Sequence, residues 1–246
     1  MFWTKSTDKK HKVLTKVMNI SFEEKHRFIN VMGEILIPAE LREVELPTVI
    51  CIPDEGKAYV DSKKIAGKLF AQKRYRTYCF DFNEMNKEKN KNYLSYEEKV
   101  KCIVEIIKKF KKSKYTKEIF LLGIGKGAEY ADSAANKIAD TISGLIFYYP
   151  QFTINVLDAD FLEECYQEDK NIDTYNYVSK YQGPVLIVHG EKDKCVDAIE
   201  YEKILDCYQN AELNILKKEP HEFTCLGRKK ARDLSCEFVD KIIHRL

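Results

Sequence analysis

Short apolar runs alternate along the chain with amphipathic segments that have helical spacing. The runs are rich in β-branched and aromatic side chains, which is typical of buried strands. We expect strands within residues 30–38, 48–52, 77–82, 119–122, 142–150, 183–190 and 213–216. We expect helices at 60–72, from 95 onward, at 128–135 and from about 228. Such alternation of strand and helix predicts an α/β protein with a largely parallel sheet and helices on both faces.

The start of the second helix carries a specific signature. Ser95 is followed three residues later by Glu98, a pairing in which each side chain satisfies a backbone N–H of the first turn. Val100, Ile103 and Ile107 then recur on one helical face. We therefore expect an N-capped helix that begins at this point and packs its apolar face on the sheet.

Composition narrows the class of protein. The 246 residues suit one large domain, 1–246, and 44% hydrophobic content is enough for a substantial core. A net charge of +2 gives no electrostatic reason to expect a nucleic-acid partner. No stretch reaches the length of a membrane span or has the apolar core of a signal peptide, and the eight Cys contain no C-x-x-C pair. We expect a cytoplasmic protein with reduced thiols and no membrane partner.

A glycine-rich turn after the strand at 119–122 is the most informative local feature. Gly123, Gly125 and Gly127 have the spacing of the G-x-S-x-G nucleophile elbow, in which a strand turns sharply into a helix and holds a Ser at the tip. Small flanking residues are needed because the turn brings backbone against backbone. Gly125 occupies the nucleophile position, so the scaffold of an elbow is present without its hydroxyl.

An acid and a histidine follow in the order that such an elbow requires. The apolar strand that ends at His189-Gly190 is followed by Asp193, and the next short strand is followed by His221. Nucleophile, acid and histidine occur in this chain order in the α/β-hydrolase triad. His189 itself lies at a strand end, where we expect a structural role.

On these motifs the chain resembles the α/β-hydrolases, and among them the small bacterial carboxylesterases of the feruloyl and cinnamoyl esterase type. The resemblance covers about 30–246 and implies an α/β-hydrolase fold with a small cap insertion, here at about 151–181. It implies that Asp193 is the triad acid and His221 the triad base, and that the vacated nucleophile position is Gly125. A small acyl or aromatic ester-like ligand is the implied partner, and no cofactor is expected.

The resemblance also implies an oxyanion hole, which this sequence alters. One backbone donor would come from the loop after the first central strand, which reads Pro53-Asp54-Glu55-Gly56, with Glu55 as the candidate. The other would be the N–H of Lys126. Two carboxylates beside a site for a developing negative charge have the wrong sign for that task. Loss of the nucleophile together with this change predicts a degenerate hydrolase with little or no esterase activity.

Two alternatives remain open from the sequence. His221, oriented by Asp193, could activate water for a weak esterase without an acyl-enzyme, and Ser133 or Ser143 could act as a substitute nucleophile. The run Gly123-x-Gly125-x-x-Ala128 also matches a dinucleotide-binding fingerprint, but it follows two earlier central strands and no acid ends the next one. A nucleotide-binding module is therefore disfavoured. No group of His, Cys and Asp has the sequence spacing of a metal site, so no metal is predicted.

Overall fold

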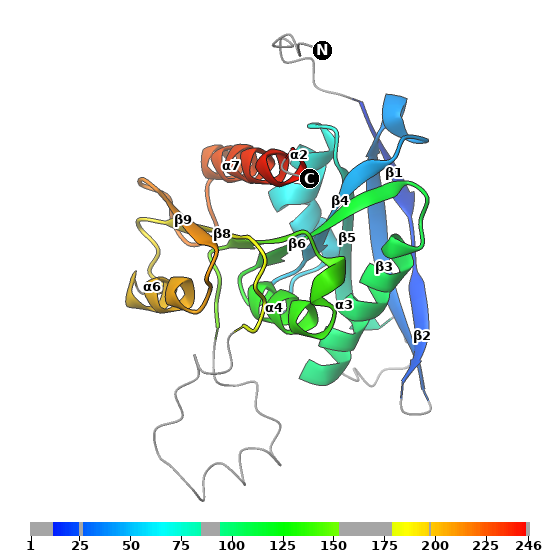
Figure 1. Ribbon diagram of the computed structural model, residues 1–246, viewed down its shortest axis with the longest axis horizontal. Coiled ribbons are helices and arrows are strands. Elements are labelled where there is room, and N and C mark those ends of the chain that lie inside the picture. Colours follow the sequence, from blue (N-terminus) through cyan, green and yellow to red (C-terminus); the bar gives the residue numbers. More distant parts are fainter. Residues whose placement is uncertain (1–11, 25–26, 85–93, 153–178, 197, 245–246) are drawn as a thin grey trace, which may run out of the picture.

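The computed structural model describes residues 12–24, 27–84, 94–152, 179–196 and 198–244. Within these residues nine strands form one sheet in the order β1-β3-β5-β4-β6-β7-β8-β9, with β2 paired to β3 beside this path (Figure 1). The strands are β1 Val13–Val17, β2 Ile20–Glu24, β3 Arg27–Pro38, β4 Leu46–Ile52, β5 Arg76–Glu84, β6 Thr116–Ile124, β7 Gly144–Tyr148, β8 Val185–Gly190 and β9 Ala211–Leu216.

Every pairing from β5 through β4, β6, β7 and β8 to β9 is parallel. The pairings of β1 and β2 with β3, and of β3 with β5, are antiparallel. The predicted α/β class with a mostly parallel sheet is therefore confirmed. Strands β1 and β2 were not predicted, because both lie at the edge and most side chains of β1 face solvent, so neither forms an apolar run.

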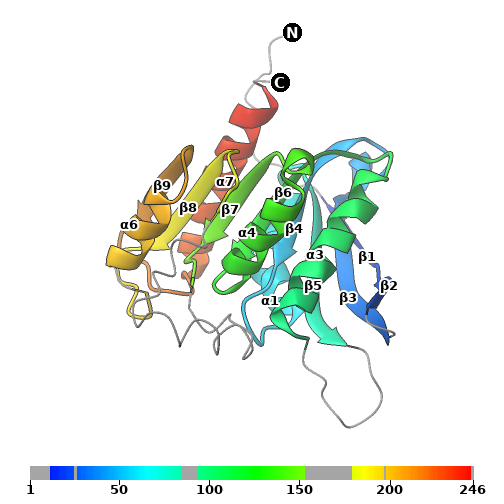
Figure 2. The same cartoon turned by 60° about the horizontal axis from the view of Figure 1, so that its bottom comes forward.

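Helices cover both faces of the sheet (Figure 2). One face carries α3, α4 and α6, and the other carries α2 and α7 (Figure 1). The helices are α1 Tyr59–Ser62, α2 Lys68–Ala71, α3 Tyr96–Lys111, α4 Gly127–Lys137, α6 Ala198–Asp206 and α7 Cys225–Ile243. A π-helical turn, Lys63–Gly67, joins α1 to α2, so the predicted first crossover helix forms with an irregular middle.

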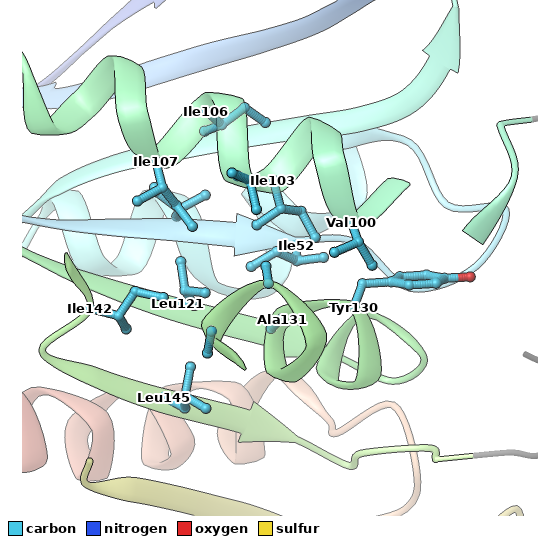
Figure 3. Close-up of a cluster of buried hydrophobic side chains, with 14 of the residues drawn as sticks. Ile52, Val100, Ile103, Ile106, Ile107, Leu121, Tyr130, Ala131, Ile142 and Leu145 are labelled. Carbon is cyan, nitrogen blue, oxygen red and sulfur yellow. The ribbon is translucent and has the colours of Figure 1, made fainter. Parts of the chain in front are cut away.

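Alternate residues of the central strands serve the two cores. In β6, Ile119 and Leu121 face α3 and α4, whereas Phe120 and Leu122 face α7. Figure 3 shows the first of these cores, in which Ile103 and Ile107 of α3 meet Leu121 and Ala131 over the sheet. This alternation is why the central strands are apolar at consecutive positions: a parallel sheet covered on both faces has no solvated side.

The helix starts follow local capping chemistry. The Ser95 N–H donates to Glu98 at 2.8 Å, and the Glu98 N–H donates to Ser95 Oγ at 3.3 Å, as the sequence predicts. Helix α7 begins at Cys225, earlier than the predicted start near 228, because Thr224 caps it by accepting from the Gly227 N–H at 3.2 Å. The predicted cap insertion at 151–181 lies almost wholly outside the described residues.

Among the residues that the structure describes, no helix is long and apolar enough to cross a membrane. The described cysteines are free thiols, and Cys51, Cys79, Cys102 and Cys236 are buried. Burial is the first cause that raises the pKa of Cys51 and Cys236, and the pKa of Cys236 reaches about 12. These two buried thiols therefore stay protonated and behave as small apolar side chains.

Candidate active site

The tip of the predicted elbow lies between β6 and α4. Gly125 has φ 53°, in the left-handed region, and its N–H donates to the Tyr148 carbonyl oxygen at 3.0 Å. The Gly125 carbonyl oxygen accepts from the Gln151 N–H at 3.0 Å. A Cβ at Gly127 would lie 2.5 Å from the carbonyl oxygen of Ile52. The flanking glycine is therefore explained by the close approach of α4 to the end of β4, as the elbow pattern requires.

Asp54 occupies the space that a side chain at Gly125, the predicted nucleophile position, would need. A Cβ built on Gly125 would lie 2.4 Å from Asp54 Oδ1 and 2.5 Å from Asp54 Cγ. Asp54 Oδ1 also accepts the Lys126 N–H at 2.9 Å and the Glu55 N–H at 2.8 Å. The two backbone donors that the sequence nominates for an oxyanion hole thus converge on one oxygen, and that oxygen belongs to the protein itself.

Helix α4 provides a physical reason for this arrangement. The unpaired N–H groups and the macrodipole of a helix make its N-terminus a favourable place for an anion. Asp54 Oδ1 lies on the N–H of Lys126, which directly precedes Gly127 at the start of α4. An anionic group at such a position contributes roughly 0.3–1 kcal/mol when exposed and up to about 2 kcal/mol when partly buried. The field that would stabilise a transient oxyanion here stabilises a permanent carboxylate.

The neighbouring charges are directed away from this point. The Lys126 ammonium pairs with Glu129 at 2.6 Å. The Glu55 carboxylate accepts from the Lys99 ammonium at 2.6 Å and from the Tyr130 hydroxyl. Burial by itself would raise the pKa of Glu55, but these two hydrogen bonds and the charges of Lys99 and Lys126 together lower it below its usual value. Of the two carboxylates in the loop after β4, only that of Asp54 lies against the elbow.

The predicted acid and base meet at the same edge of the sheet. His221 Nδ1 lies 2.7 Å from Asp193 Oδ2, and the Asp193 side chain is 1% exposed. Asp193 Oδ1 accepts the N–H groups of Cys195 and Val196 at 2.8 and 3.1 Å. One carboxylate oxygen therefore holds its own loop while the other orients the imidazole. This pairing leaves His221 Nε2 as the nitrogen available for proton transfer.

His189 packs below this pair. Its Nε2 lies 3.2 Å from Asp193 Oδ2, but neither ring nitrogen has a well-formed hydrogen bond within the described part of the chain. Burial, the first cause, lowers the pKa of His189 despite the nearby Asp193. The ring is neutral near pH 7, so the short contact is not a charged ion pair. Its tilted ring contact with Tyr201, with ring centroids 4.5 Å apart, fits the structural role expected of it.

Tyr149 joins the two parts of the site and was not among the residues singled out from the sequence. Its ring centroid lies 4.7 Å from that of His221 and 5.0 Å from that of Phe223. Tyr149 and Phe223 have φ of 39° and 35°, which is unusual for residues with a Cβ and is often found at functional sites. Burial, followed by the charges of Asp54 and Glu222, raises the pKa of Tyr149, so the phenol keeps its proton.

A small cavity adjoins Tyr149 and Asp54. It has a volume of about 160 Å³. Most of its lining residues are charged. They come from the loop after β4, the first crossover helix, the start of the loop after β7, and the loop and helix after β9: Asp54, Lys57, Asp61, Lys64, Ile65, Tyr149, Glu222 and Arg228. The Tyr149 hydroxyl and Arg228 Nε are buried and have no hydrogen-bond partner among the described residues. Buried polar atoms without partners cost stability, so a polar ligand in this cavity would be favoured.

One grouping of possible metal ligands appears that sequence spacing did not suggest. Ligand atoms of Asp193, Cys195 and His221 lie within 4.8 Å of one another. Asp193 and His221 are already hydrogen-bonded to each other, so a metal that bound here would have to break the pair that orients the imidazole. The three residues come together because the loops after β8 and β9 are adjacent, which local spacing does not reveal.

The substitute nucleophiles are placed elsewhere. Ser133 Oγ is hydrogen-bonded to the Tyr96 hydroxyl, between α4 and α3. The Ser143 N–H bonds to the Ile119 carbonyl at 2.8 Å, near the start of β6, whereas Gly125 follows the end of that strand. Neither serine joins Asp193 and His221.

These features define the α/β-hydrolase fold: a mostly parallel sheet, a sharp glycine turn after β6, an acid after β8 and a histidine after β9. The sequence profile of the family described as serine hydrolase (FSH1) matches residues 22–222, and the chain belongs to that family. No relative was found among curated protein sequences.

Solved structures show the same fold. The chain is similar to Est1E from Butyrivibrio proteoclasticus, with 16% identity, coverage of 90% of this chain and 99% of that one, and a TM-score of 0.68. It is similar to a dienelactone hydrolase from Anabaena variabilis, with 14% identity, coverage of 91% and 96%, and a TM-score of 0.67. An esterase from Pyrococcus furiosus shares 16% identity over 94% and 92%, with a TM-score of 0.65.

Proposed function

We propose that this chain is a degenerate serine hydrolase with little or no carboxylic ester hydrolase activity. The observation that carries the proposal is the position of Asp54: its carboxylate fills the nucleophile space at Gly125 and accepts the Lys126 N–H. Loss of the nucleophile from a triad costs about 10⁶ in turnover, and loss of one oxyanion donor costs about 10²–10³. Both losses act on acyl transfer, and a negative charge in the hole repels the oxyanion that the reaction forms.

The retained pair supports a second candidate, a weak esterase in which His221 activates water. Asp193 holds His221 Nδ1 at 2.7 Å, which is the orientation a general base needs. Its rate is expected to be low, because the oxyanion would still meet the Asp54 carboxylate. A small acyl or aromatic ligand fits either candidate, and Est1E, which has been solved with ferulic acid bound, supports that class of ligand.

Hydrolysis of p-nitrophenyl acetate and butyrate by the native protein and by His221→Ala separates the two candidates. We expect both proteins to match the rate of an unrelated protein at equal concentration. Glu191→Gln is a matched control, because Glu191 is an exposed carboxylate of the loop after β8 that accepts the Lys218 N–H. A native rate above background that falls in His221→Ala and stays in Glu191→Gln would overturn the first candidate and establish the second.

A further inference from the structure

The Asp54 carboxylate fills the space beside Gly125, and its surroundings are also those of a nucleophile. Asp54 Oδ1 receives the backbone N–H groups of Glu55 and Lys126. Asp54 Oδ2 accepts no hydrogen bond from the part of the chain that the structure describes, and the residue lines the small cavity beside Tyr149. Carboxylates serve as nucleophiles in covalent catalysis when one oxygen is held and the other is free to attack.

We propose that Asp54 replaces the missing serine as a carboxylate nucleophile, and that the site opens small polar epoxides to diols by way of an ester on Asp54. The proposal rests on the same placement of Asp54 as the proposed function and adds an activity on saturated carbon. An attack on saturated carbon develops no oxyanion in the first step, so a carboxylate in the hole does not oppose it.

In the first step Asp54 Oδ2 forms a bond to a ring carbon of the epoxide. The carbon–oxygen bond of the ring breaks, and its electron pair goes to the ring oxygen, which takes the proton of the Tyr149 hydroxyl. Tyr149 is suited to this because it lines the same cavity as Asp54 and its hydroxyl lacks a hydrogen-bond partner among the described residues. Arg228, which also lines that cavity, lowers the pKa of Tyr149 against the effect of burial and so favours the phenolate that forms.

In the second step the ester is hydrolysed, and the oxyanion hole acts in its usual way. His221, held by Asp193, takes a proton from water, and the hydroxide attacks Asp54 Cγ. Negative charge develops on Oδ1, which already accepts the Glu55 and Lys126 N–H groups. The bond from Cγ to the alkyl oxygen breaks, and the leaving alkoxide takes the proton from His221. The new carboxylic acid returns a proton to Tyr149, so epoxide and water have become a diol.

The cavity sets the class of substrate. Its volume of about 160 Å³ is below the range of about 300–1,000 Å³ that is usual for drug-sized ligands. Ile65 is the one aliphatic residue in its lining, and the rest are charged or phenolic. The carbon atoms of these side chains still form much of the cavity surface, so its small volume is what favours a compact epoxide such as glycidol over an aryl or long-chain epoxide.

The test uses glycidol and the full-length protein. His221→Ala should accumulate one glycidol per chain, located on Asp54 by peptide mapping, because the second step has lost its base. The double variant Asp54→Ala/His221→Ala should carry no such adduct, and Glu191→Gln/His221→Ala should carry the same amount as His221→Ala. In H₂¹⁸O, one turnover by the native protein should place one ¹⁸O atom in the Asp54 carboxyl group.

A His221→Ala protein without the Asp54 adduct would overturn the proposal, as would turnover that puts ¹⁸O only in the diol. Circular dichroism of each variant shows whether it is folded, and the ¹⁸O experiment needs no variant. Ester hydrolysis by the native protein would contradict the proposed function but would not change the expected glycidol adduct or ¹⁸O labelling of Asp54. Failure of the labelling experiments would leave the proposed function standing.

Discussion

The loops after β8 and β9 and the loops after β4 and β6 meet at the same edge of the sheet, but they hold different arrangements. The first pair presents Asp193 and His221 at 2.7 Å, as a working triad would. The second pair presents Gly125 with the Asp54 carboxylate against it. Asp193 also fixes its own loop through the Cys195 and Val196 N–H groups, so a structural need maintains this residue without catalysis. A retained acid and base are therefore weak evidence of activity.

The largest effect on stability is expected at the elbow. Gly125→Ala must hold a Cβ at φ 53° and against Asp54 Oδ1 at 2.4 Å. Left-handed strain costs about 1–2 kcal/mol and overpacking about 1–3 kcal/mol, so we expect a loss of about 2–5 kcal/mol in the free energy of unfolding. Urea denaturation measures it.

Gly56→Ala is the matched control, because Gly56 has φ 69° and nothing within 4 Å of its Cβ position. It should lose only about 1–2 kcal/mol. In an Asp54→Ala background, the cost of Gly125→Ala should fall to the same value. Equal costs for Gly125→Ala and Gly56→Ala in the native background would show that Asp54 does not fill the space at the elbow.

A pH-dependent effect of intermediate size is expected from α4, the helix that follows the elbow. Burial raises the pKa of Asp132 to about 6, although Tyr208 donates to Oδ1 at 2.9 Å. Since the folded pKa lies above the unfolded value, this group's contribution to stability is present below about pH 4 and is lost as the pH rises through about 6. The rise of the Asp132 pKa to about 6 corresponds to roughly 3 kcal/mol.

Asp132→Asn keeps the acceptor for Tyr208 and removes the titration. Relative to the native protein, the variant should become increasingly more stable as the pH rises from about 4 to 6. Above pH 6 the difference in the free energy of unfolding should stay constant at about 2–3 kcal/mol. Denaturant titrations at successive pH values check this. A difference between the two proteins that does not vary with pH would show that Asp132 is not the titrating group.

The smallest effect is expected at the exposed ion pair that joins the loop after β4 to the loop after β9. Lys57, from the loop after β4, pairs with Glu222, next to His221, at 3.1 Å, and their side chains are 43% and 56% exposed. Exposed pairs contribute about 0–1 kcal/mol. Lys57→Met should therefore change the free energy of unfolding by at most about 0.5 kcal/mol, measured in low salt and again in high salt. A loss above about 2 kcal/mol would mean that this pair, and not the sheet, holds the two sets of loops together.

The fold could be predicted because the β4–β9 region follows simple rules. Its parallel strands are buried on both faces and therefore appear as apolar runs in the sequence. Ser95 and Glu98 form a capping box that predicts the start of a helix directly. Strands β1 and β2 were not predicted because edge strands need no apolar run. The start of α7 was predicted too late because Thr224 is an N-cap without the Glu or Gln that completes a capping box.

The site was only partly predictable. Asp193, His221 and Gly125 follow fixed points of the sheet, so chain order alone nominates them. The position of Asp54 depends on a side-chain direction that sequence does not give. Two carboxylates near a predicted oxyanion hole suggest repulsion, whereas in the structure Asp54 accepts the Lys126 N–H and Glu55 pairs with Lys99. Tyr149 was missed because its side chain reaches the site through its own left-handed backbone conformation, directly after β7, which the sequence does not reveal.

Burst kinetics with p-nitrophenyl butyrate test most directly the claim that Asp54 fills both the nucleophile space and the oxyanion hole. The native protein, Gly125→Ser, Asp54→Ala and the double variant are compared at equal concentration. The account predicts an acyl-enzyme burst only in the double variant, where a hydroxyl is present and Asp54 no longer accepts the Lys126 N–H, and the loss of this burst when His221→Ala is added. A burst from Gly125→Ser alone, or none from a folded double variant, would contradict it.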